Sequence, residues 1–199
     1  MRFREFLGDI LGSKVKVRVL RLFLRFPEKE FIEGEIEELL GNPHQSVTYA
    51  LKDMINYQIV TVRKIGRNKI YSLNRDNYIV EDILSPMFKN EAGAIHELVN
   101  DLKTCLAPLK VKRAILYGSI AMAQEEFDSD IDILVVVSDK GEVEEVQKAL
   151  ADLRNLLVKK FGNALSPIVM AAGEYEKQKK LGKGLIKSVE EGGMTIIGE

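Results

Sequence analysis

Apolar residues recur at helical spacing near the start of the chain. Between residues 15 and 24 the pattern is Val-x-Val-x-x-Leu-x-x-Phe-Leu, and Pro27 follows, so we expect a helix of about three turns that ends before the proline. Residues 35–40 predict a second, short helix that ends at Gly41. Asn42 and Pro43 are typical of an N-cap and a first helical residue, which predicts a third helix directly afterwards.

The third predicted helix has an apolar side and a polar side. Val47, Leu51, Met54 and Ile55 share the apolar side. The polar side carries hydrogen-bonding groups that suit base edges and phosphates, namely Gln45, Ser46, Thr48, Tyr49 and Lys52. A polar outer face is also what any solvated helix shows.

A basic hairpin is predicted after this helix. Residues 59–65 and 69–73 have strand patterns and flank Gly66-Arg67-Asn68. Its positive charges are Arg63, Lys64, Arg67 and Lys69. Such charges suit a polyanion, but they also discourage edge-to-edge pairing of strands.

Three helices followed by a basic hairpin resemble the winged helix-turn-helix regulators, in particular the ArsR/MarR-like group, over residues 13–75. The resemblance implies that the third helix enters the major groove of double-stranded DNA and that the wing tip contacts phosphate or the minor groove. Winged helices also serve as protein-interaction modules. Where the family usually has a glycine before the first wing strand, this chain has Gln58.

A second pattern lies further along the chain. An apolar strand, Ile115 to Tyr117, stops at Gly118-Ser119, and a later strand opens with Asp130-Ile-Asp132. Two acids one residue apart on a strand project from the same face, so they can converge on an oxygen-liking cation such as Mg²⁺. A glycine turn that opens a short helix lets the backbone approach a phosphate, and the serine adds a hydroxyl donor.

This combination resembles the DNA polymerase beta nucleotidyltransferase superfamily, and among its branches the minimal nucleotidyltransferases of prokaryotes, over roughly residues 109–199. The resemblance implies that Gly118 and Ser119 hold a nucleoside triphosphate. It also implies that Asp130 and Asp132 are catalytic and bind two Mg²⁺ ions, which assist in-line attack by an acceptor hydroxyl.

The chain departs from the family pattern at two places. Met122 and Ala123 stand where family members often have Arg and Gly. The later strand near residues 163–170 contains no acid, although fuller sites take a third carboxylate there. Asn163 or Ser166 could supply a neutral oxygen, and Asp128 could substitute from the preceding loop.

The remaining segments complete an α+β chain of two domains. Residues 143–161 and 174–189 predict helices, whereas 166–170 and 194–197 predict strands of a mixed sheet. We expect a winged helix over residues 1–75, a helical connector over 76–108 that is bent near Pro86, and a nucleotidyltransferase-like domain over 109–199. The apolar connector packs either as ordinary core or against a second copy in a homodimer, which would suit a palindromic DNA site.

Composition adds limits. Residues 1–75 hold 14 Lys and Arg against 9 Asp and Glu, a formal charge of +5, so polyanion binding is expected in this half. Cys105 is the one cysteine, which excludes a disulfide framework within a chain. No apolar run is long enough to span a membrane and the first residues do not resemble a signal peptide, so we expect a cytoplasmic protein without membrane partners.

Together these features predict a DNA-binding transcription regulator that carries a nucleotidyltransferase domain. That domain would transfer a nucleoside monophosphate to a hydroxyl of a protein or small molecule, and the family resemblance allows a partner toxin, as in toxin–antitoxin pairs, as the acceptor. The alternative is a regulator without catalysis, whose degenerate domain serves as a ligand sensor or dimerisation module.

Overall fold

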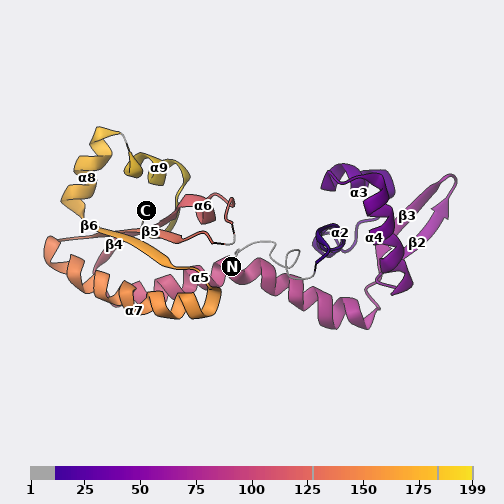
Figure 1. Ribbon diagram of the computed structural model, residues 1–199, viewed down its shortest axis with the longest axis horizontal. Coiled ribbons are helices and arrows are strands. Elements are labelled where there is room, and N and C mark those ends of the chain that lie inside the picture. Colours follow the sequence, from indigo (N-terminus) through magenta and orange to yellow (C-terminus); the bar gives the residue numbers. More distant parts are fainter. Residues whose placement is uncertain (1–11, 127, 183, 199) are drawn as a thin grey trace. The chain divides into compact units, whose positions relative to one another are not determined.

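The computed structural model describes residues 12–126, 128–182 and 184–198 (Figure 1). Residues 1–11 of the expected first domain and residues 127, 183 and 199 of the expected third lie outside the described residues. The chain divides between Gly93 and Ala94 into two compact units, inside the segment expected to be a connector. We call residues 12–93 the winged-helix unit and residues 94–198 the sheet unit.

Between Lys14 and Leu73, the described residues of the winged-helix unit form three helices and a small antiparallel sheet of strand order β1-β3-β2. Its elements are α2 (Lys14–Arg25), β1 (Phe31–Ile32), α3 (Glu33–Leu40), α4 (His44–Asn56), β2 (Val60–Ile65) and β3 (Asn68–Leu73). This is the winged helix-turn-helix topology that the sequence predicted, with α4 as the third helix and β2–β3 as the wing.

One apolar core joins the helices of this unit to its sheet. The apolar stripe of α2 buries Val19 and Phe23, and the Phe23 ring meets the Phe31 ring of β1 edge to face at 5.3 Å. Ile36 of α3 and Leu51 of α4 are buried in the same cluster. The helical spacing therefore sets which face of each helix is covered.

The turn between α3 and α4 is sharp. Gly41 ends α3 in the left-handed conformation, with φ 58°. Pro43 has ψ 140° and is the N-cap of α4, so the helix begins at His44, one residue later than the Asn42-Pro43 pattern predicted. The Asn42 side chain instead accepts a hydrogen bond of 2.9 Å from Arg18 of α2.

A π-helical stretch (Ile79–Leu84) leads directly into α5 (Ser85–Leu106). Pro86, which has no N–H to donate, is the second residue of α5 and follows the π-helical stretch directly, in which the Ser85 N–H donates to the Val80 carbonyl. Where the sequence led us to expect a bend near Pro86, the chain changes from a π-helix to an α-helix. Phe88 of α5 packs on Val17 of α2 in a small cluster of the winged-helix unit.

The sheet unit is built on four strands in the order β6-β5-β4-β7, of which β5 and β6 run parallel and the other neighbours antiparallel. Its elements beyond α5 are β4 (Val111–Tyr117), α6 (Gly118–Ala121), β5 (Ile131–Val137), a 3₁₀ turn (Lys140–Glu142), α7 (Val143–Phe161), β6 (Leu165–Ala171), α8 (Ala172–Leu181), α9 (Leu185–Gly192) and β7 (Met194–Ile197).

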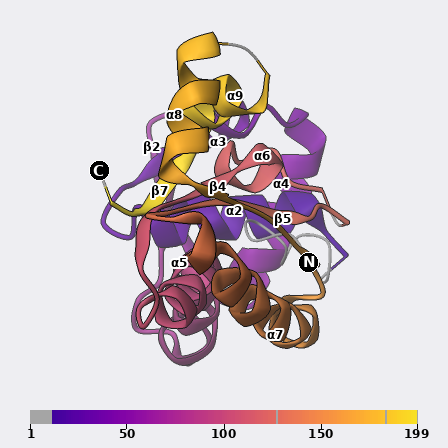
Figure 2. The ribbon, with the colours of Figure 1, turned by 90° about the vertical axis from the view of Figure 1, so that its left-hand side faces the viewer.

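Helices cover both faces of this sheet (Figure 2). Ile131 and Ile133 of β5 face a core with α7 and the last turns of α5, whereas Leu134 faces α8 and α9. The helical stretch predicted over 174–189 was wrong as one element, because the backbone breaks at Gly182, with φ 59°, between α8 and α9. No helix formed by the described residues is long and apolar enough to cross a membrane.

Candidate nucleotide site and candidate DNA-binding surface

Three neighbouring strands bring polar groups together at one edge of the sheet unit. Tyr117 at the end of β4 pairs with Asp132 near the start of β5, and Asp132 pairs on its other side with Ser166 of β6. Alternation places the side chains of these paired residues on the face that α8 and α9 cover further along the strands. The end of β4 is also where the Gly118-Ser119 turn begins.

Gly118 lies directly against Asp132. Its φ is +73°, and a Cβ placed on it would lie 2.4 Å from the Oδ2 atom of Asp132. A side chain there is excluded both by the left-handed backbone and by the carboxylate. The turn therefore brings its backbone close to the Asp132 carboxylate, and Ser119 follows in the first turn of α6.

The surroundings of Asp132 disfavour its negative charge. Partial burial and then the nearby Asp130 carboxylate raise the pKa of Asp132, while a hydrogen bond from the Ser166 hydroxyl works in the opposite direction. Burial, followed by the charge of Asp132, also raises the pKa of Tyr117. A bound cation would relieve the repulsion between the two carboxylates.

Asp130 is exposed and lies immediately before β5. The loop that carries it is fixed by Asn163, whose buried amide donates a hydrogen bond of 2.8 Å to the carbonyl of Ser129. The sequence suggested Asn163 and Ser166 as neutral ligands. The Asn163 amide instead holds the loop in place, whereas the Ser166 hydroxyl forms a hydrogen bond with the Asp132 carboxylate. Asp128 is exposed in the same loop.

The donor set fits Mg²⁺, because two carboxylates and a hydroxyl are hard oxygen ligands. Within the described ranges, no group of three Asp, Glu, His or Cys side chains converges at this edge of the sheet. Ser166 occupies the register position next to Asp132 on β6. Two carboxylates offer less negative charge to a pair of ions than three would.

A further polar cluster was not foreseen from the sequence. Arg113 of β4 donates hydrogen bonds of 2.6 Å to the Tyr175 hydroxyl of α8 and 2.5 Å to Glu190 of α9, and Lys179 contacts Glu190 at 2.9 Å. Glu190 accepts three donors, and although burial alone would raise it, its pKa is lowered on balance. The cluster ties α8 and α9 to the strand that ends at Gly118. Tyr117 and this cluster depend on strand register and on long-range packing, which no local motif encodes.

The predicted DNA contacts on α4 lie on its outer side. Gln45, Thr48, Tyr49 and Lys52 are exposed, whereas Ser46 is half-buried. Tyr49 has 60% of its surface exposed, so its hydroxyl and ring are accessible on this face of the helix. The single proton of the Thr48 hydroxyl has two acceptors within reach, the carboxylate of Glu33 on α3 and, at 3.0 Å, the carbonyl of His44.

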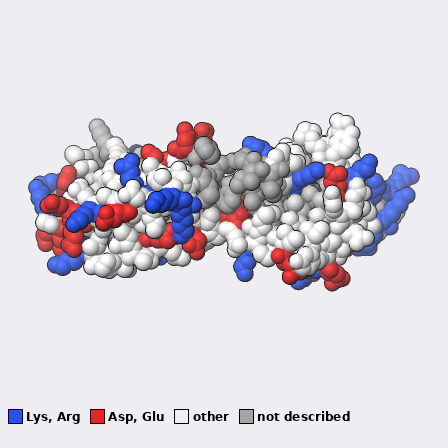
Figure 3. Space-filling model, turned by 60° about the horizontal axis from the view of Figure 1, so that its bottom comes forward, with Lys and Arg blue, Asp and Glu red and all other residues white. Residues whose placement is uncertain are grey.

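The wing carries its positive charges on exposed side chains. Arg63, Lys64, Arg67 and Lys69 are all exposed, and Figure 3 shows Lys and Arg side chains gathered over the projecting β2–β3 hairpin. Arg63 pairs with Glu30 at 2.5 Å. Ile65 pairs with Asn68, so a two-residue turn of Gly66 and Arg67 closes the hairpin and places Arg67 at its tip.

Comparison with known proteins identifies relatives of the sheet unit. Residues 100–167 match the family model described as polymerase beta, nucleotidyltransferase. A putative protein adenylyltransferase of Methanocaldococcus jannaschii is 36% identical over 89 residues, which cover 45% of this chain and 82% of that protein.

Solved structures resemble the chain only at low sequence identity. The apo form of a double mutant of ZitR from Lactococcus lactis has 15% identity and a TM-score of 0.32, and the match covers 77% of this chain and 92% of that one. TrmBL2, an archaeal chromatin protein described with a novel mode of DNA binding, has 12% identity and a TM-score of 0.32, covering 94% and 73%. Such scores are too low to carry an argument, so the winged-helix topology rests on the elements described above.

Proposed function

Because the chain belongs to the polymerase beta nucleotidyltransferase family through its sheet unit, we propose that it is a DNA-binding regulator whose nucleotidyltransferase domain acts on a nucleoside triphosphate with Mg²⁺. The domain transfers a nucleoside monophosphate to a hydroxyl group of an acceptor. The observation that carries the proposal is the packing of Gly118 against Asp132, beside Asp130 and Ser119.

Each residue of this site has a distinct task in the proposal. Gly118 lets the backbone approach the triphosphate, and the Ser119 hydroxyl donates a hydrogen bond to a phosphate oxygen. Asp130 and Asp132 hold Mg²⁺, and Ser166 orients the Asp132 carboxylate by its hydrogen bond. A bound ion would supply positive charge against the negative charge of the triphosphate oxygens. The acceptor oxygen bonds to the α-phosphorus as the bond from that phosphorus to the bridging oxygen breaks. The acceptor hydroxyl gives its proton to water, and pyrophosphate leaves with the electron pair of the broken bond.

The name of the M. jannaschii relative favours a protein as the acceptor and an adenylyl group as the transferred unit. The acceptor is then a Ser, Thr or Tyr hydroxyl on a partner, a class that includes a partner toxin. DNA binding is assigned to the outer face of α4 and to the wing, whose exposed cations suit phosphate.

Ser166 favours a second candidate function. A hydroxyl in place of a third carboxylate reduces the negative charge that could hold a second ion. The domain would then bind a nucleotide without turning it over and serve the regulator as a ligand sensor or dimerisation module.

Incubation with α-labelled ATP, Mg²⁺ and a cell extract as the source of acceptors distinguishes these functions. Protein-bound label that disappears in Asp130→Ala/Asp132→Ala supports the transferase, and Glu144→Ala/Glu145→Ala is the matched control because it removes two exposed acids of α7. Calorimetry with Mg²⁺ and ATP is the second measurement. Binding without transfer favours the sensor, whereas binding that is unchanged in the Asp130/Asp132 double variant contradicts the assigned site.

A further inference from the structure

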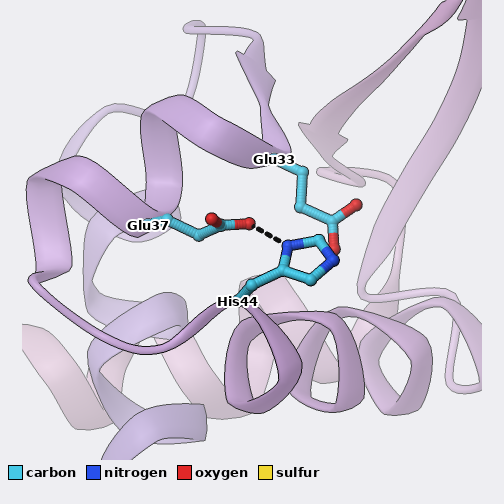
Figure 4. Close-up of side chains that lie close together, drawn as sticks. All are labelled: Glu33, Glu37 and His44. Carbon is cyan, nitrogen blue, oxygen red and sulfur yellow. Dashed lines mark hydrogen bonds and ion pairs between the residues drawn. The ribbon is translucent and has the colours of Figure 1, made fainter.

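Three side chains suited to a metal ion meet in the helix-turn-helix, outside the nucleotide site. Glu33 and Glu37 are four residues apart on α3 and so share one helix face, and His44 is the first residue of α4. Figure 4 shows the two carboxylates on either side of the His44 imidazole. One ligand atom from each residue lies within 4.8 Å of the other two.

The group offers both nitrogen and oxygen ligands, whereas a cluster of surface acids offers oxygen alone. One imidazole nitrogen and two carboxylates are ligands of Zn²⁺ and related transition-metal ions, whereas Mg²⁺ and Ca²⁺ prefer oxygen alone. Ligands around a tetrahedral Zn²⁺ lie ~3.3 Å apart, given metal–ligand bonds of about 2.0–2.1 Å. The His44 side chain is 71% exposed, so its ring can turn to reach this spacing without disturbing the core.

We propose that Glu33, Glu37 and His44 bind one transition-metal ion of the Zn²⁺ type, with water in the remaining position, and that the ion clamps α3 to α4. The site lies wholly within the winged-helix unit. Among the residues that the structure describes, it is also the one group in which three such side chains come together.

Neighbouring side chains already support the Glu33 carboxylate. The Thr48 hydroxyl donates to its Oε1 atom, and the Tyr71 hydroxyl of β3 donates to its Oε2 atom at 3.1 Å. Hydrogen bonds of this kind orient carboxylate ligands in metal sites. The short turn through Gly41 and Pro43 fixes the start of α4 relative to α3, which keeps His44 beside Glu37.

The competing arrangement is a plain ion pair. His44 Nδ1 lies 2.5 Å from Glu37 Oε1, an arrangement that a protonated imidazole satisfies without a metal. A metal ion must displace this proton, because the ligand is the neutral ring. The two arrangements differ in whether the protein takes up a metal ion at all.

The test is calorimetric titration of the full chain with Zn²⁺, repeated with Co²⁺ and visible absorption. The parent protein carries Asp130→Asn/Asp132→Asn, so that the other carboxylate pair does not contribute. In this background His44→Ala and Glu37→Gln each remove one proposed ligand. The matched controls are His96→Ala and Glu38→Gln, which change an exposed histidine and an exposed glutamate outside the group.

We expect one Zn²⁺ per chain, an affinity at least tenfold weaker in His44→Ala and in Glu37→Gln, and no change in either control. Excess Mg²⁺ should not compete, because the site contains an imidazole. Circular dichroism checks folding, and His44→Ala decides the matter if Glu37→Gln misfolds, since the His44 side chain is mostly exposed. The proposal is overturned if the parent binds no Zn²⁺, or if His44→Ala binds it as the parent does.

Discussion

Two residues other than glycine occupy left-handed backbone in this chain, within the described residues. Ala123 has φ 57° just after α6, and Gln58 has φ 54° just before the first wing strand. These are the two positions at which the family resemblances led us to expect glycine. The side chains present here therefore strain the backbone that the fold requires at each position.

Ala123→Gly should stabilise the sheet unit by about 0.5–1 kcal/mol. The change removes a left-handed Cβ penalty of about 1–2 kcal/mol, and the greater freedom of glycine in the unfolded chain offsets part of that gain. Gln58→Gly should do the same for the winged-helix unit. The measurement is urea unfolding followed by circular dichroism.

The control for this prediction is Ala121→Gly. The same change two residues earlier falls within α6, and there it should destabilise by about 1 kcal/mol because the backbone is helical. A loss of stability in Ala123→Gly as large as in the control would contradict the argument from φ.

At the residue scale, the sequence predicted much of the candidate site. The spacing of Gly118, Asp130 and Asp132 required only that two strands run side by side. It could not choose among Asn163, Ser166 and Asp128 as a further ligand, because that choice depends on the register of β6 against β5. A one-residue shift in that register would have turned Ser166 to the opposite face. Whether these residues bind nucleotide and metal stays a prediction.

At the scale of elements, periodicity predicted which segments are helices and strands, but not all of their boundaries. The stretch over 174–189 reads as one helix because its apolar positions keep helical spacing across Gly182 and Gly184. The backbone breaks there so that α8 and α9 can each pack an apolar residue, Tyr175 and Ile186, on the same face of the sheet. Packing of this kind is set by the whole unit.

The contact between α2 and α5 yields a prediction about stability. The guanidinium of Arg21 donates hydrogen bonds of 2.8 to 3.3 Å to the carboxylate of Glu91, and Glu91 is only 4% exposed. Removing one partner of a buried, hydrogen-bonded ion pair is destabilising. Because Arg21 keeps some contact with water, Glu91→Ala should lower the free energy of unfolding by about 2–3 kcal/mol, toward the lower end for such pairs.

Glu97→Ala provides the comparison for this measurement, because Glu97 lies on the same helix and pairs with Lys160 at an exposed position. Its loss should cost less than about 1 kcal/mol, as for most surface pairs. Denaturant unfolding of both variants tests the difference, and equal effects would show that burial of Glu91 does not determine the cost.

At the scale of the whole molecule, the distribution of charge leads us to expect DNA binding by the winged-helix unit alone. We expect Arg67→Ala/Lys69→Ala to weaken binding to every DNA duplex and to flatten its salt dependence, because fewer counterions are released. Changes at Gln45 or Tyr49 should instead alter discrimination between sequences, by ~1–3 kcal/mol per lost bidentate contact. Fluorescence anisotropy with a selected duplex at several salt concentrations provides the measurement.

Lys177→Ala/Lys180→Ala is the matched control for the wing, since it removes two exposed cations from α8 of the sheet unit. Asp130→Ala/Asp132→Ala should likewise leave duplex binding unchanged. If the wing variant binds every duplex as tightly as the native chain, with the same salt slope, the wing does not contact DNA phosphate.

Because α5 contributes residues to the cores of both units, it limits where the chain can be cut into two fragments that each keep a complete core. Phe88 and Glu91 complete the packing of α2, whereas Leu98, Leu102 and Leu106 of the same helix belong to the core beneath β4 and β5. A fragment that stops after the wing hairpin would expose Val17 of α2 to water, because Phe88 of α5 packs on it. Expression boundaries placed near Gly93, with a few extra residues of α5 kept on each side, would leave both products with the helix turns that their cores need.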